Sequence, residues 1–69
     1  MDKKFIEKYF ENKTQIKINL KNGYFYQGII IKVEGNTILF KDKFGAEMPI
    51  DLDSISYVVA VERGGENGS

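Results

Sequence analysis

The sequence has no cysteine and no histidine among its 69 residues, and it has a single proline. Disulfide bridges and cysteine-based metal sites are therefore excluded, and so are thiol nucleophiles and imidazole bases. No other catalytic constellation is recognisable along the chain. We expect a protein that is not an enzyme and that needs no cofactor, no metal and no small-molecule substrate.

Net charge and long apolar runs are also lacking. Ten basic residues balance ten acidic ones, so the bulk positive charge that holds duplex nucleic acid non-specifically is missing. A nucleic-acid ligand would have to be held by stacking, backbone groups and local charge. No apolar run approaches the roughly 18 residues of a membrane-spanning helix, and the N-terminus has no signal-peptide stretch. We expect a cytoplasmic protein without a membrane partner.

The chain is short for a protein without covalent staples. A domain of this size buries only about 60% of the surface that its unfolded chain exposes. Oligomerisation is then the remaining common source of stability. We predict one domain over residues 1–61 that assembles with copies of itself, and a tail over 62–69 that is disordered because it has no apolar anchor.

Residues 2–12 carry a helical pattern. Phe5, Ile6, Tyr9 and Phe10 recur at a spacing that gathers them on one face. A helix this short is not stable alone in water. Its aromatic face is therefore expected to pack on the open end of a small barrel.

Period-two alternation of apolar residues after the helix predicts five strands, separated by turns rich in glycine, asparagine and aspartate. The strands are expected at residues 14–20, 24–33, 37–41, 46–50 and 55–61. This order of elements predicts a mostly β protein, with an N-terminal α-helix followed by a five-stranded, strongly bent antiparallel SH3-like open barrel.

The first hairpin turn contains Asn22-Gly23, and two registers are open there. A two-residue loop sets Leu20 opposite Phe25, whereas a three-residue loop with Gly23 in the left-handed conformation sets Leu20 opposite Tyr24. A slip of one residue exchanges the two faces of the whole second strand.

The second strand carries two further signals. Gly28 marks a place where the strand can bend, because glycine has no Cβ to clash. The three consecutive isoleucines at residues 29–31 make both faces apolar. Strong curvature, a docked helix or a partner subunit would each cover such a strand.

The strands at 46–50 and 55–61 are predicted to lie at the edges of the sheet. Pro49 cannot donate to a ladder, which favours an edge position. Residues 55–60 carry no charge. An apolar edge aggregates unless another copy covers it. Pairing one edge with the different edge of the next copy can close into a ring.

The spacing I-x-I-x-L-x-N-G-x-x-x-x-G-x-I, followed by an acidic turn, resembles the Sm-like (LSm) family and, within it, the bacterial Hfq branch. The resemblance covers roughly residues 3–61. The short turn at 34–36 is more similar to Hfq than to the longer loop of eukaryotic and archaeal members. The matching positions are Ile16, Ile18, Leu20, Asn22, Gly23, Gly28, Ile30, Glu34 and Leu39.

The resemblance implies a hexameric or heptameric ring in which strand 46–50 of one subunit pairs with strand 55–61 of the next. It implies single-stranded RNA as the partner, bound near the pore and, in Hfq, also on the face opposite the helix. It favours the three-residue hairpin loop, with Tyr24 and Tyr26 on the side of Ile16 and Ile18. The expected subunit interface consists of Met48, Ile50, Tyr57, Val58 and Val59.

The chain departs from the family pattern at the pore. Residues 51–53, Asp-Leu-Asp, stand where Hfq has Tyr-Lys-His and where Sm proteins have Arg-Gly. Two aspartates per subunit would repel phosphate there. They also fit a Mg²⁺ site, although turn capping is the commoner role of aspartate in such a loop. The candidate pore-side RNA contacts are Glu34, Gly35, Asn36, Asp51 and Asp53.

The face opposite the helix retains more of the Hfq pattern. Asn19, Tyr24, Phe25 and Gln27 match positions of the adenine-binding face of Hfq. Aromatic side chains there can stack on bases, and the alternative is that they only cover the hairpin. The leading hypothesis is therefore an RNA chaperone or scaffold. A ring that serves as a protein–protein scaffold and a monomeric SH3-like module are the alternatives.

Overall fold

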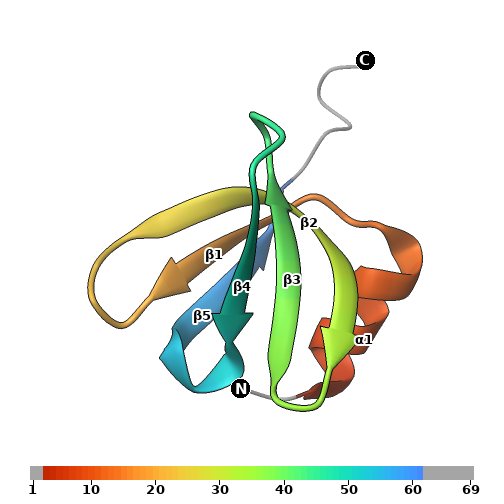
Figure 1. Cartoon of the computed structure of the whole chain (residues 1–69), viewed down its shortest axis with the longest axis horizontal. Coiled ribbons are helices and arrows are strands. Elements are labelled where there is room, and N and C mark those ends of the chain that lie inside the picture. Colours follow the sequence, from red (N-terminus) through yellow and green to blue (C-terminus); the bar gives the residue numbers. More distant parts are fainter. Residues whose placement is uncertain (1–2, 62–69) are drawn as a thin grey trace.

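The computed structural model describes residues 3–61, so the predicted disordered tail over 62–69 lies outside the described residues. One helix precedes five strands, and a short 3₁₀ helix connects the last two of them (Figure 1). The elements are α1 (Lys3–Asn12), β1 (Ile16–Leu20), β2 (Phe25–Glu34), β3 (Thr37–Asp42), β4 (Glu47–Asp51), η1 (Leu52–Ser54) and β5 (Ile55–Ala60).

The five strands form one antiparallel sheet in the order β4-β3-β2-β1-β5. The sheet bends strongly, and β4 and β5, its two edge strands, do not pair with each other (Figure 1). The helix and the open barrel predicted from the sequence are therefore confirmed. The two strands predicted to be edges, β4 and β5, are the edges of the described sheet.

A single apolar core lies inside the bend. The helix contributes Ile6, which is fully buried, while Tyr9 and Phe10 pack against the core from its margin. This burial confirms that α1 docks on the barrel, beside β2, through Ile6, Tyr9 and Phe10 (Figure 1), whereas Phe5 of the predicted apolar face is 53% exposed. The buried core residues are Ile6, Ile16, Ile18, Ile30, Ile38, Phe40, Ile50, Leu52 and Ile55.

The first hairpin adopts the three-residue loop. The Leu20 N–H donates to the Tyr24 carbonyl at 2.8 Å, and Ile18 lies opposite Tyr26. Gly23 has φ +95°, a left-handed conformation that glycine adopts without cost. The register favoured by the family resemblance is therefore confirmed, and it places Asn19 opposite Phe25 on the outer face of the sheet.

Two irregularities shape β2. The pairing with β3 shifts between Ile30 and Lys32, which leaves Ile31 as the extra residue of a β-bulge. The run of isoleucines is therefore interrupted by a bulge that returns Val33 to the inner face, opposite buried Ile38. Gly28 is buried because the β3 backbone passes directly over it, at the carbonyl of Lys41.

Candidate functional site

The outer face of the sheet carries two cross-strand rows over β5, β1 and β2. In the first row Asn19 lies between Tyr57 and Phe25, its pairing partners on either side. Directly opposed residues of this kind have Cβ atoms about 5 Å apart. Phe25 is 58% exposed and Tyr57 is 55% exposed, so two aromatic side chains face solvent on either side of one amide.

The second row sets Lys17 between Val59 and Gln27. The Lys17 ammonium reaches diagonally to the first row and lies 4.4 Å from the centroid of the Phe25 ring. A cation at this distance over an aromatic face is attracted by the ring quadrupole. The aromatic row therefore carries a positive charge at its edge, in a chain whose net charge is zero.

The side-chain amide of Asn19 has a donor that makes no hydrogen bond to the described residues. Its Nδ2 atom is buried and has no hydrogen-bond partner among the residues that the structure describes. A buried donor left unpaired costs about 1–3 kcal/mol. Since the Nδ2 atom has almost no accessible surface, an acceptor from a ligand would reach it only after the side chains around it move.

Tyr24 is separated from the other three predicted residues of this face. It follows the turn, where its N–H donates to the Asn22 side chain at 3.0 Å. Because successive residues of a strand point to opposite faces, Tyr24 and Phe25 project to different sides of the hairpin. Tyr24 is 66% exposed at the hairpin end, which projects from the barrel on the side away from α1 (Figure 1). Asn19, Phe25 and Gln27 therefore form the group, and Tyr24 flanks it.

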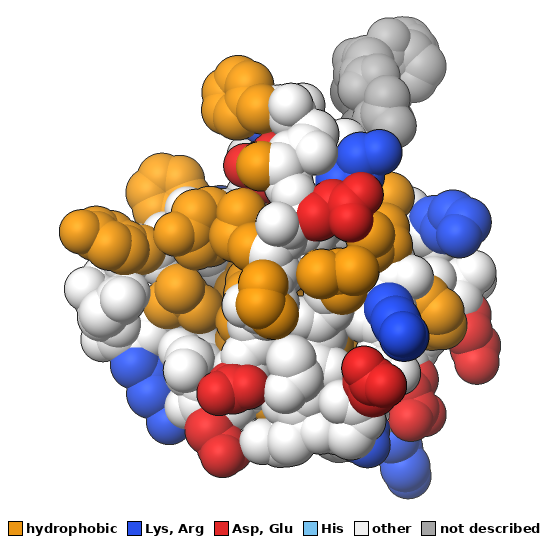
Figure 2. Space-filling model, viewed as in Figure 1, with side chains coloured by type: hydrophobic (Ala, Val, Ile, Leu, Met, Phe, Trp, Pro, Cys, Tyr) orange, Lys and Arg blue, Asp and Glu red, His pale blue; other side chains and the backbone are white. Residues whose placement is uncertain are grey.

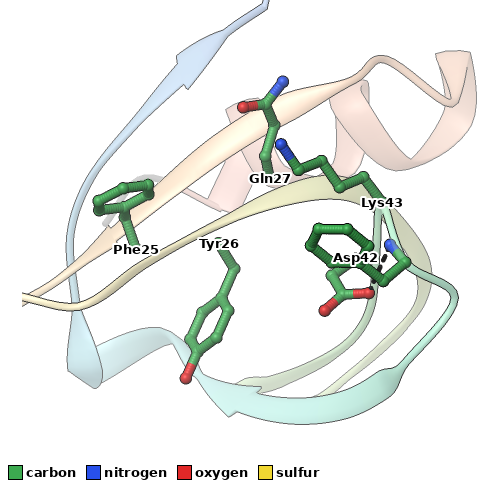
Figure 3. A pocket seen from close by; sticks show the side chains of 6 residues that line it. Phe25, Tyr26, Gln27, Asp42 and Lys43 are labelled. Atoms are coloured by element: carbon green, nitrogen blue, oxygen red, sulfur yellow. Dashed lines mark hydrogen bonds between the residues drawn. The ribbon is translucent and has the colours of Figure 1, made fainter.

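Two further aromatic residues, which the sequence pattern alone does not place there, lie beside this group. Tyr57, predicted for the subunit interface, lies on edge strand β5, and the register also sets its side chain on the outer face beside Asn19. Phe44, in the turn between β3 and β4, is 85% exposed and lines a cavity together with Phe25 and Gln27, whose side chains are labelled in Figure 3. The strand alternation around Asn19 would have revealed Tyr57, whereas the position of Phe44 depends on how the sheet bends.

The predicted pore-side residues come together at the other end of the sheet. The turn between β2 and β3 and the helix η1 are joined by a hydrogen bond from the Leu52 N–H to the Asn36 carbonyl at 2.8 Å. Glu34, Gly35, Asn36, Asp51 and Asp53 are all exposed there.

The carboxylate of Asp51 has a different partner from the one expected. It makes no capping hydrogen bond to the η1 backbone and instead accepts from the Thr37 hydroxyl at 2.9 Å. Among residues 3–61 no group of three or more metal-ligating side chains is positioned to hold a metal ion. No helix in that range is long and apolar enough to cross a membrane.

The residues predicted for the subunit interface lie along the two edges in different settings. Ile50 is 6% exposed and belongs to the core, so only its backbone is available at the edge of β4. Met48 and Val58 are half-buried, whereas Tyr57 and Val59 face solvent on the outer side. Figure 2 shows apolar side chains in a band from the β1–β2 hairpin across β4.

Hydrogen-bond alternation identifies the backbone groups that the edge of β5 leaves free. The Val61 N–H donates to the Gln15 carbonyl at 2.8 Å. Because hydrogen-bonded and non-hydrogen-bonded pairs alternate in an antiparallel ladder, the N–H groups of Val58 and Ala60 point away from β1. They form part of the free edge.

Hydrogen bonds also alternate between β3 and β4. The Asp42 N–H donates to the Ala46 carbonyl at 2.9 Å, so the pairs alternate from there along β3 and β4. Pro49 lies opposite Leu39 in a non-hydrogen-bonded pair, and its nitrogen points to the free edge. The missing N–H of Pro49 therefore costs the sheet nothing and removes one donor from the edge.

With this geometry established, comparison with known proteins identifies the fold. No protein-family model matches the sequence, and no curated protein matches it either. Among solved structures, the chain is similar to the 1.55 Å crystal structure of Hfq, described as a pleiotropic translational regulator. The two superpose with a TM-score of 0.76 at 21% sequence identity, over 84% of this chain and 95% of that one.

This chain has the Sm-like fold of Hfq. The Sm-like fold consists here of the helix, the five-stranded bent sheet and the two unpaired edges. The β1–β2 register decides which residues face the outer surface of this Sm-like sheet. The local sequence allows two registers, and the family resemblance favours the one that the structure has.

Proposed function

We propose that this chain assembles into an Sm-like ring that binds single-stranded RNA on the outer face of its sheet and acts as an RNA chaperone or scaffold without catalysis. The observation that carries this proposal is the row Tyr57–Asn19–Phe25, in which exposed aromatic rings flank a buried, unpaired amide donor. The fold shared with a translational regulator supports the same ligand class.

The chemistry of the row suits a base better than a phosphate. Base–aromatic stacking contributes about 1–3 kcal/mol per base and does not need a basic surface. The Asn19 carboxamide offers hydrogen bonds to a base edge, as asparagine does when it recognises adenine. Lys17, held over Phe25, supplies one local positive charge for the backbone. These contacts explain how a chain without net charge would bind a polyanion.

The edges support assembly into a ring. The outer edges of β4 and β5 are unpaired in the described chain. β5 carries no charged residue, whereas β4 carries exposed Glu47 and Asp51 at its two ends. A hollow of about 460 Å³ beside β4, lined in part by Leu20, Tyr26 and Met48, gives an incoming apolar strand a place to bury side chains. Pairing of β4 with β5 of the next copy would satisfy both edges. We propose a hexamer or a heptamer.

The acidic end of the sheet argues for the outer face over the pore as the RNA site. Asp51 and Asp53 are exposed next to the turn at Glu34, and a ring would repeat these carboxylates around its axis. Like charges gathered there repel phosphate. We therefore expect RNA binding to depend on Phe25 and Tyr57 and to tolerate changes at the acidic turn.

Fluorescence anisotropy with labelled oligo-A and oligo-U at low salt tests the RNA proposal, because electrostatic attraction is strongest there. We expect oligo-A to bind, and we expect Tyr57→Ala and Phe25→Ala each to weaken it about fivefold or more. Phe5→Ala is the matched control, because Phe5 is a similarly exposed aromatic residue on α1. Absence of binding to either oligonucleotide would remove the RNA claim.

Native mass spectrometry tests the ring. The unmodified chain is expected as a hexamer or heptamer, and Val58→Pro is expected as smaller species because it deletes a donor from the free edge of β5 and none from the β1–β5 ladder. Circular dichroism of the variant should keep its β signal. A wild-type chain that is monomeric at ordinary laboratory concentration would contradict the proposed assembly.

A protein–protein scaffold is the alternative, and one observation favours it. Phe25, Tyr57 and Val59 form an exposed apolar group on the outer face, of the kind that also occurs at protein interfaces. Affinity purification with and without RNase separates the two functions. Partners that survive RNase would favour the scaffold, and partners that all depend on RNA would refute it.

A further inference from the structure

The loop between β3 and β4 is ordered by hydrogen bonds and presents an aromatic side chain. Asp42 organises the loop, because its Oδ1 atom accepts from the N–H groups of Phe44 and Ala46, each at 2.9 Å. Gly45, with φ +92°, closes the turn. The Lys43 N–H donates to the Gln27 carbonyl at 2.8 Å, which ties the loop to β2. Phe44 is therefore 85% exposed on a fixed loop.

A cavity of about 150 Å³ lies between this loop and β2. Phe25 stands at one side of it, and Lys43 and Asp42 stand at the other (Figure 3). Tyr26, Gln27 and Phe44 also line it, so two exposed aromatic residues from different hairpins, Phe25 and Phe44, border one space. The Lys43 ammonium lies 5.5 Å from the centroid of the Phe44 ring.

The size of the cavity limits its occupant. An engineered apolar cavity of about 150 Å³ in another protein holds one benzene molecule, whereas drug-sized ligands need at least about 300 Å³. One six-membered ring therefore fills this space, whereas part of the double ring of a purine would extend out of it into solvent. The aromatic walls favour a planar ring over an aliphatic group, because planar rings stack.

The polar groups at the cavity suit the edge of a nucleobase and a phosphate. The Gln27 side chain lies beside Lys43 in Figure 3 and offers both a donor and an acceptor. Lys43 is exposed and supplies a positive charge for a phosphate. The Asp42 carboxylate, the one negative group in the lining, already accepts two backbone N–H groups through one oxygen.

We infer that this cavity is a second base-binding position, selective for a pyrimidine nucleotide of a single-stranded RNA. The base stacks between Phe25 and Phe44, its edge pairs with Gln27, and its phosphate lies at Lys43. The inference rests on the proposed RNA function and extends it, because Phe25 borders both this cavity and the row at Asn19. An RNA strand on the outer face would then meet two positions of different base preference.

Anisotropy titrations with oligo-A, oligo-U and oligo-C of equal length test this inference on the full chain. Phe44→Ala is expected to weaken a pyrimidine oligonucleotide by about fivefold or more, as loss of one stacked base does, and to change oligo-A by less than twofold. Phe44→Tyr should keep wild-type affinity, since its ring stacks equally well. Lys43→Gln should lower the slope of log affinity against log salt by about 0.7, the value for one phosphate on a single strand.

The outcomes separate this inference from the proposed function. If the wild-type chain binds no oligonucleotide, both are overturned. If it binds oligo-A alone, or if Phe44→Ala leaves pyrimidine binding unchanged, the cavity assignment is overturned and the RNA function stands. The pyrimidine assignment is also overturned if Phe44→Ala weakens binding of all three oligonucleotides equally. It is overturned as well if Phe5→Ala weakens pyrimidine binding as much as Phe44→Ala does. Because Phe44 is almost fully exposed, its variants should melt at the wild-type temperature.

Discussion

Gly28 is the position at which the smallest change should do the most damage. A Cβ added there would collide with the Lys41 carbonyl oxygen and come within 2.7 Å of the Asp42 Cα. Carbon atoms in good contact are about 3.5–4.0 Å apart, so β3 would have to retreat by about 1 Å. Both obstacles are backbone atoms, which cannot rotate out of the way.

The loss of stability depends on the contacts that are broken when β3 moves away from β2. β2 and β3 share the most extensive strand contact in the described sheet, and the tie from Lys43 to Gln27 lies directly beside Gly28. Overpacking a core by one methyl group costs about 1–3 kcal/mol, and a backbone obstacle places Gly28→Ala at the upper end, at about 3 kcal/mol. A core of this size supplies only about 3–5 kcal/mol in total.

Thermal unfolding followed by circular dichroism measures this loss. For a domain of this size each kcal/mol shifts the midpoint by about 4–8 °C, so Gly28→Ala should melt about 12–24 °C below the wild type, and Gly28→Val should not fold. Both samples need the same chain concentration, because assembly raises apparent stability by mass action. Gly35→Asn is the matched control, since Gly35 has open space around it and a φ of +59° that asparagine tolerates. An unchanged midpoint in Gly28→Ala would refute the reasoning.

Three further predictions follow from burial, from the unpaired amide and from the free edge. Ile6→Ala should lower the free energy of unfolding by about 2–5 kcal/mol in urea titrations, because Ile6 is fully buried where α1 docks; a loss below 1 kcal/mol would show that the helix is dispensable. Asn19→Leu should leave that free energy unchanged or raise it by about 1 kcal/mol while weakening oligo-A binding, because it removes an orphaned donor; a loss of 2 kcal/mol would mean that the amide is satisfied. Pro49→Val should make the proposed ring more resistant to dilution in native mass spectrometry, because it restores an N–H to the free edge of β4; earlier dissociation would contradict the edge assignment.

The elements themselves could be read from local patterns. The spacing of Phe5, Ile6, Tyr9 and Phe10 placed the helix, and period-two alternation placed the strands, because each pattern reports one face buried against a core. The observed bounds differ from the predicted ones by one or two residues at the ends of several elements. Pro49 correctly indicated an edge, because its missing N–H is tolerated only there.

Only part of the candidate site could be predicted from local sequence patterns. The residues Asn19, Phe25 and Gln27 were chosen through a family resemblance, and the local sequence around Asn22-Gly23 left two registers open. The register decides which face Phe25 occupies, and it depends on long-range packing of the alternate residues against the core. The places of Tyr57 and Phe44 beside this group could not be predicted from local sequence, because their neighbours on the surface come from β1 and β2, which are distant in the sequence.

The sequence by itself determined which segments are helix and strand, where the turns fall and that the chain leaves two edges unpaired, since these depend on neighbouring residues and on backbone chemistry. Only the tertiary structure decided that a bulge at Ile31 resets the inner face of β2 and that the β3 backbone passes over Gly28. Only the tertiary structure shows that Phe44 and Phe25 line the same cavity. The bend of a sheet sums small twists over many paired residues, and no single stretch of sequence contains that sum.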